Sequence, residues 1–163
     1  MRRLRAATHL SYEILKYIHV LGAVVILGTG AGIAFFMLMA HLSGDIRFIA
    51  RTAGTVVIAD LVFTATAVIA QPITGYLLTR TIGVPLLTGW VLWSLVLYAV
   101  AGVFWLPVVW MQAKMRNLAC AAEAQGTALP PLYHRLFRTW FLFGIPGFSS
   151  VMAILWLMIT KPA

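Results

Sequence analysis

Apolar residues run along the chain in four long stretches that contain few formal charges. A helix that crosses ~30 Å of hydrocarbon needs about 20 largely apolar residues. Charged or helix-breaking residues bound stretches of about that length at 17–41, 53–79, 86–113 and 139–160. The alternation of apolar and polar residues that is typical of barrel strands does not compete with this pattern. The pattern predicts an all-α fold, a polytopic membrane four-helix bundle, with residues 1–163 forming a single membrane domain.

The connections between these predicted spans are short. Residues 42–53 and 117–134 form the connections at one membrane surface, and Pro130 and Pro131 mark the second as a loop with about one helical turn at its start. The basic N-terminal segment precedes an apolar run that is too long for a signal peptide, so we expect an uncleaved first span. An even number of spans places both termini on the same side of the membrane.

Composition and charge narrow the class of partner. Hydrophobic residues make up 62% of the chain and charged residues 10%, far below the roughly one quarter that is usual in soluble domains. The net charge of +8 is spread between and beside the apolar stretches, which favours the lipid bilayer and its anionic headgroups as partners, and no nucleic acid. The Lys and Arg residues divide equally between the two sides, so they do not orient the protein. If the Arg-rich N-terminal tail is discounted, the two connections would be cytoplasmic.

Polar side chains inside the predicted spans form two stripes. At 100° per residue, each set falls on one face of its helix. The first stripe consists of Asp60, Thr64, Gln71 and Thr74, and the second of Ser94, Tyr98, Trp105 and Gln112. Unsatisfied polar groups are costly in hydrocarbon, so we expect both stripes to face the bundle interior or each other. They serve either as interhelical hydrogen bonds or as the lining of a hydrated or ligand-holding interior.

Asp60 is the only acidic residue within the predicted second span. An ionisable residue at this depth is a functional-site hypothesis by default, because hydrocarbon does not solvate its charge. The structural alternative is an ion pair with Arg51 or Arg138, whose long side chains could reach inwards from the interface.

His19 lies near the start of the first predicted span. It is either a packed, hydrogen-bonded residue or a ligand. His41 lies 22 residues later, roughly 33 Å along a helix, so the two histidines cannot share a metal within one subunit. The other predicted spans contain no histidine, so neither a bis-histidine haem between spans nor a dedicated metal site is predicted.

Small residues and helix-breaking residues add further expectations. Gly28 and Gly32 form a GxxxG pair that lets another backbone approach, either within the bundle or from a second copy or a partner subunit. Prolines at 72, 107 and 146 each free a backbone carbonyl inside a span. Five tryptophans near the predicted span ends suggest an aromatic belt: Trp90, Trp93, Trp110, Trp140 and Trp156.

Several segments together resemble a bacterial family of predicted integral membrane proteins of unknown function. The resemblance covers nearly the whole chain, and it implies a multi-pass protein of the bacterial inner (cytoplasmic) membrane without naming an activity. The segments are "LKYIHVLGAVVILGTGAGIAFFML", "ADLVFTATAVIAQPITGYLL", "WLPVVWMQAKMR" and "FGIPGFSSVMAILWLMITKP".

The chain is also distantly similar to the HemJ family of membrane protoporphyrinogen oxidases. That family opens its first span with a Lys-x-x-His-x-x-Gly pattern and closes its last with Lys-Pro, as do Lys16, His19, Gly22, Lys161 and Pro162 here. The resemblance implies that His19 is a ligand of haem b. An arginine and a lysine of that family fall at Phe35 and Ser94 in this chain, a departure that puts the oxidase reaction in doubt.

Three classes of function follow from the sequence. The first is a haem b-binding redox protein, a possible membrane oxidoreductase, in which His19 is the axial ligand and Gln71, Thr74 and Ser94 form the polar surround. The second is a small permease or channel component in which Asp60 and the two stripes line a path. The third is an accessory subunit that binds a partner through the GxxxG face. No residue type or spacing identifies catalytic residues.

Overall fold

The structure, a computed structural model, describes residues 2–162 and the side chains of residues 10–162. Its elements, in chain order, are α1 (Arg2–Ser43), α2 (Ile46–Ala59), the π-helical turn η1 (Asp60–Thr64), α3 (Ala65–Ile82), α4 (Gly89–Gln125) and α5 (Pro131–Thr160). Four segments of this described part are long and apolar enough to cross a membrane: Leu10–Ser43, Ile46–Ile82, Gly89–Gln125 and Pro131–Thr160. The described residues form no strand, so the predicted all-α four-helix membrane fold is confirmed.

The helices are longer than the predicted spans, and the connections are correspondingly shorter. The third predicted span ended at residue 113, but α4 continues to Gln125 and the loop after it covers only residues 126–130. Beyond Ala113, Lys114 is exposed while Met115 and Ala119 are fully buried. A charged residue ends the stretch that can lie in hydrocarbon, but it does not end a helix whose opposite face still packs. The predicted loops at 42–53 and 117–134 were therefore too long.

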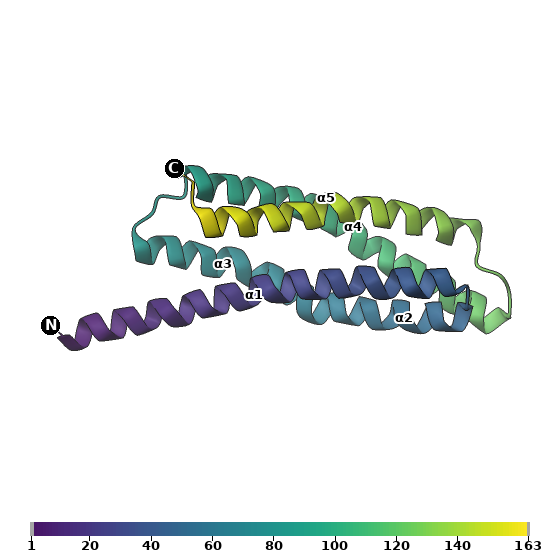
Figure 1. Ribbon diagram of the computed structural model, residues 1–163. Helices are drawn as coiled ribbons and strands as arrows, with labels where there is room; N and C mark the ends of the chain where they lie inside the picture. The colour runs from purple at the N-terminus through teal and green to yellow at the C-terminus, as the bar shows by residue number, and fades with distance from the viewer. Residues whose placement is uncertain (1, 163) are drawn as a thin grey trace.

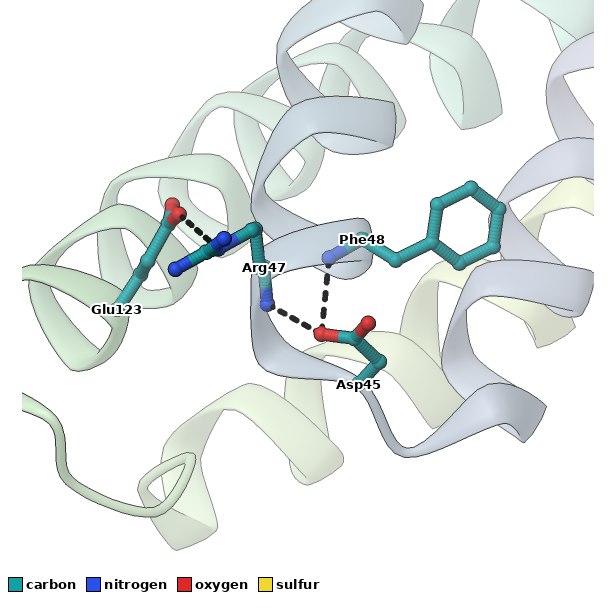
Figure 2. A network of polar contacts seen from close by, with 4 residues as sticks. All are labelled: Asp45, Arg47, Phe48 and Glu123. Carbon is teal, nitrogen blue, oxygen red and sulfur yellow. Dashed lines mark hydrogen bonds and ion pairs between the residues drawn. The ribbon is translucent and has the colours of Figure 1, made fainter.

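A polar cap fixes the start of α2 beside the end of α4 (Figure 2). The Asp45 carboxylate accepts hydrogen bonds from the backbone N–H groups of Arg47 at 2.9 Å and Phe48 at 3.2 Å, two of the unpaired donors at the helix start. Arg47 also forms an ion pair with Glu123, with 3.5 Å between Nε and Oε1. Because the Arg47 side chain is 70% exposed, this pair contributes little stability by itself.

Loss of the Asp45 cap is expected to cost about 1 kcal/mol in the free energy of unfolding, in an Asp45→Ala variant. Asp45→Asn keeps a side-chain oxygen that can accept the same bonds and serves as the matched control. The measurement is chemical unfolding of the purified protein in detergent. Equal losses in both variants would show that the negative charge, not the cap, stabilises this end.

The main core occupies the half of the bundle that contains the connections at residues 44–45 and 126–130. There α4 packs along α5, and α2 lies between α1 and α4. The largest fully buried side chains come from all four of these helices: Met37, Ile49, Met115 and Tyr133. This half is closed by side-chain packing.

The other half, towards the termini, is built differently. There α3 packs against α1 while α4 packs against α5. The N-terminal part of α1 extends away from the other helices (Figure 1). Both chain ends lie at this end of the molecule (Figure 1), as the even number of spans predicts. The core of large buried side chains therefore lies in one half of the bundle, while the other half is built from the pairs α1–α3 and α4–α5.

Candidate functional site

Asp60 lies at the centre of a buried polar chain that links α4 and α5 to the second span. It is only 4% exposed, and its Oδ1 accepts a hydrogen bond from Trp105 Nε1 at 3.4 Å. We orient the Gln112 amide with its nitrogen towards Asp60, because the opposite orientation places acceptor against acceptor. Gln112 then donates to Asp60 Oδ2 at 3.1 Å and accepts from Trp140 Nε1 at 3.2 Å. Each carboxylate oxygen thus has a neutral N–H donor.

An ion pair between Asp60 and Arg51 or Arg138, the structural alternative that the sequence left open, is absent among residues 10–162. Arg51 and Arg138 are both exposed, and the ion pair found within residues 10–162 joins Arg47 to Glu123. The groups next to the Asp60 carboxylate are the Trp105 indole, the Gln112 amide and the Thr64 hydroxyl, all of them neutral. Asp60 is therefore a buried acid whose described partners carry no positive charge.

A pocket of about 390 Å³ opens from this polar chain into the middle of the bundle. Asp60, Thr64, Trp105 and Gln112 supply polar groups at its surface, and Thr64 Oγ1 is buried there without a well-formed hydrogen bond to a described residue. The remaining wall is largely apolar and comes from α1, α4 and α5; it includes Ile26, Ile33, Val108, Phe143, Phe148 and Val151. The volume and lining are those of a small-molecule site, apolar with a few convergent polar groups.

Glycines make the room for this pocket. Gly102 on α4 and Gly144 on α5 both line it, and a Cβ atom added at either position would meet no neighbouring atom within 4 Å. Gly28 and Gly32, the predicted packing pair, also have no neighbouring atom within 4 Å of an added Cβ, but these two glycines do not line the pocket. The prediction that Gly28 and Gly32 pack closely against another helix of the bundle is therefore wrong. The alternative, contact of this pair with a second copy or a partner subunit, stays a prediction.

A π-helical turn explains why the first predicted stripe divides. The N–H of Ala65 bonds to the carbonyl of Asp60, a five-residue step in place of the usual four. The extra residue rotates everything after it relative to the 100° rule on which the stripe was predicted. Asp60 and Thr64 consequently face the pocket, whereas Gln71 and Thr74 turn to α1. π-Turns of this kind are frequent at functional sites.

His19 forms a second polar contact, between α1 and α3. Its Nδ1 lies 2.8 Å from Thr74 Oγ1, and its backbone carbonyl accepts a hydrogen bond from Gln71 Nε2 at 2.8 Å. Glycines on both helices allow this approach: a Cβ added at Gly75 would lie 3.2 Å from His19 Cε1, and one added at Gly22 would collide with the Gln71 amide. A rise of 1.5 Å per residue places Gln71 roughly 16 Å from Asp60 along the span, so the two contacts are separate sites.

Gly22→Ala is expected to destabilise the protein by about 1–2 kcal/mol, because the new methyl group displaces the Gln71 amide from the His19 carbonyl. Gly28→Ala, on the same helix and with nothing within 4 Å, is the matched control. It should be neutral or stabilising by up to about 1 kcal/mol, since alanine favours the helix. Thermal unfolding in detergent measures both, and a tolerated Gly22→Ala would argue against the α1–α3 contact.

The second predicted stripe is reproduced over most of its length. Tyr98, Trp105 and Gln112 line the pocket together with Ala101, but Ser94 donates to the carbonyl of Trp90 in its own helix. The Tyr98 hydroxyl donates to the carbonyl of Val68. Pro72, four residues later, has no N–H to give that carbonyl, so Tyr98 satisfies a group that the proline frees.

Trp140 is the functional residue that sequence reasoning missed. Its position near the predicted start of the last span suggested a membrane belt, but α5 begins at Pro131 and Trp140 lies within it, 4% exposed. Its ring lines the pocket and its N–H bonds to Gln112. Trp93, Trp110 and Trp156 are exposed. Only the packing distinguishes Trp140 from these.

The fold and the pocket together define a polytopic α-helical membrane protein with an interior, partly polar cavity. The chain belongs to the family described as "Predicted integral membrane protein (DUF2269)", which matches residues 13–162. No curated protein and no solved structure matches the chain. The resemblance to a family of predicted integral membrane proteins is thus confirmed, and the similarity to HemJ stays a prediction.

Proposed function

We propose that this protein is a membrane-embedded binding protein, of the small permease component class, that takes a small and largely apolar molecule into the pocket beside Asp60. The observation that carries the proposal is the pocket itself, about 390 Å³ and lined by Asp60, Thr64 and Gln112 on an otherwise largely apolar wall. An acid buried among four spans is costly to retain. Its place at the pocket surface gives it a role that helix packing does not require.

Access from the bilayer supports this proposal. Three residues that line the pocket on α5, Phe141, Ile145 and Phe148, are exposed on the surface of the bundle, where lipid surrounds a membrane protein. An apolar molecule dissolved in the membrane can therefore enter sideways and meet the polar groups only once it is inside.

Photolabelling with benzophenone tests the proposal. Benzophenone is a small apolar ketone that inserts into nearby C–H bonds on illumination, and mass spectrometry locates the labelled residues. Wild-type protein in lipid nanodiscs should be labelled preferentially at pocket-lining residues of α4 and α5. Gly102→Leu fills the pocket and should remove this labelling, whereas Gly28→Leu, at an open position outside the pocket, should not. Labelling spread evenly over lipid-facing residues and unchanged by Gly102→Leu would refute the proposal.

Haem b binding at His19 is a second candidate, favoured by one specific observation. Thr74 engages Nδ1 of the ring, and no hydrogen bond to a residue of the described part occupies Nε2. A hydrogen bond to one imidazole nitrogen orients the ring for ligation through the other. Haem bound there would supply one-electron chemistry.

An absorption spectrum tests the haem candidate separately from the pocket. Protein expressed with ample haem should show a Soret band that His19→Ala abolishes and Gly102→Leu leaves intact. Thr74→Val should shift the band or weaken haem binding by about 10-fold or more, as loss of a supporting hydrogen bond does. Colourless wild-type protein would exclude this function.

A further inference from the structure

Asp60 has no positively charged partner among its described neighbours. Resting on the proposed function, we propose that the bound molecule is an amphipathic organic cation, with an apolar body in the pocket and one protonated amine against Asp60. The argument combines the state of the carboxylate, the aromatic rings beside it and the nature of the wall.

The hydrogen bonds around Asp60 come from neutral donors and leave the carboxyl group able to bind a further donor. Trp105 supplies an indole N–H to Oδ1, and Gln112 supplies an amide N–H to Oδ2. An ionised carboxylate only accepts hydrogen bonds, and it has about four acceptor positions. The two N–H groups and the neighbouring Thr64 hydroxyl account for up to three of these and leave acceptor capacity for a donor from the pocket. A carboxyl group buried in this way either takes up a proton or keeps its charge beside an opposite charge. A ligand amine supplies that opposite charge together with hydrogen-bond donors.

Two tryptophan rings add a second feature that favours a cation. Trp105 and Trp140 both line the pocket, and the N–H groups of both are engaged in the Asp60–Gln112 chain. Their N–H edges are therefore held in place, and ring surface contributes to the pocket. Tryptophan is the aromatic residue that attracts cations most strongly, within about 6 Å of the ring. A pocket that holds one carboxylate, one indole bonded to it and a second indole one residue further along the chain of hydrogen bonds is suited to an alkylammonium group.

The same surroundings disfavour other ligands. An anion would be repelled by Asp60 and would meet no lysine or arginine among the lining residues. A metal ion would need several hard or nitrogen ligands, and the described part of the chain has no group of three or more His, Cys, Asp or Glu side chains that could hold one. A neutral molecule fits the apolar wall but gives Asp60 no opposite charge.

Three probes with one apolar skeleton test this inference: phenylbutylamine, phenylbutanol and phenylbutyrate. Each is titrated near neutral pH against wild-type protein in nanodiscs of zwitterionic lipid, with displacement of benzophenone labelling and thermal stabilisation as readouts. The amine should bind about tenfold or more tightly than the alcohol, a difference of about 1.4 kcal/mol, and the carboxylate should bind most weakly. Gly102→Leu should remove binding of the amine and the alcohol alike.

Variants then locate the preference. Asp60→Asn should remove the advantage of the amine and leave binding of the alcohol in place, while Asp45→Asn, at a surface acid, should change neither. The order of the three probes on wild-type protein needs no variant, so it decides the inference even if Asp60→Asn fails to fold. Equal binding of amine and alcohol, still lost in Gly102→Leu, would overturn the cation and keep the pocket. Absence of Gly102→Leu-sensitive binding for every probe would overturn both.

Discussion

Tyr133→Ala is expected to lower the free energy of unfolding by about 3–5 kcal/mol, the cost of removing a large aromatic side chain from a packed interior. Tyr133 is 0% exposed. Its ring stacks with those of His41, at 5.8 Å between centroids, and Phe137, at 6.5 Å. It belongs to the core of the closed half, where no solvent or lipid can fill the space left behind. Chemical unfolding in detergent measures the loss.

Tyr133→Phe is the matched control and should change stability in the opposite direction. The Tyr133 hydroxyl is buried, and it has no hydrogen-bond partner in the part of the chain that the structure describes. Removing an unsatisfied buried hydroxyl while keeping the ring should be neutral or should stabilise the protein by up to about 1 kcal/mol. If Tyr133→Phe is instead as destabilising as Tyr133→Ala, the hydroxyl has a partner, and the assignment of this residue to simple packing is wrong.

Asp60→Leu is expected to have the second large effect, a loss of about 2–6 kcal/mol in the free energy of unfolding. The substitution leaves the N–H groups of Trp105 and Gln112 buried without an acceptor, and each unsatisfied group costs about 1–3 kcal/mol. Asp60→Asn retains one carbonyl oxygen and should lose less. Thermal and chemical unfolding of the three proteins in the same detergent gives the comparison.

A double-mutant cycle separates this buried chain from a general effect of the substitution. Residues in one hydrogen-bond network are coupled, so Asp60→Leu combined with Gln112→Leu should cost less than the sum of the two single losses. The pair Asp60→Leu and Asp45→Ala, whose hydrogen bonds share no partner, should be additive within about 0.5 kcal/mol. Additive losses for Asp60 and Gln112 would show that the amide does not donate to the carboxylate.

The sequence by itself determined the architecture, the interior position of Asp60 and much of the polar interior. Hydrophobic length predicted four crossings because hydrocarbon thickness fixes how many apolar residues a helix needs. Three residues of the second stripe, Tyr98, Trp105 and Gln112, share one face as predicted. The reason is that α4 is α-helical over this segment, so the 100° rule applies there. His19 and Thr74, both predicted to be interior, do meet.

Only the tertiary structure decided which polar residues act together. The π-turn at Asp60–Thr64 changes the helical phase, and no periodicity rule contains that change, so one predicted stripe became two separate contacts. Trp140 has the sequence context of a belt residue, but packing against α4 buries it. The glycines that matter, Gly22 and Gly75 at the α1–α3 contact and Gly102 and Gly144 at the pocket, depend on what lies opposite each one. That neighbour comes from another helix, so spacing along one chain segment cannot identify it.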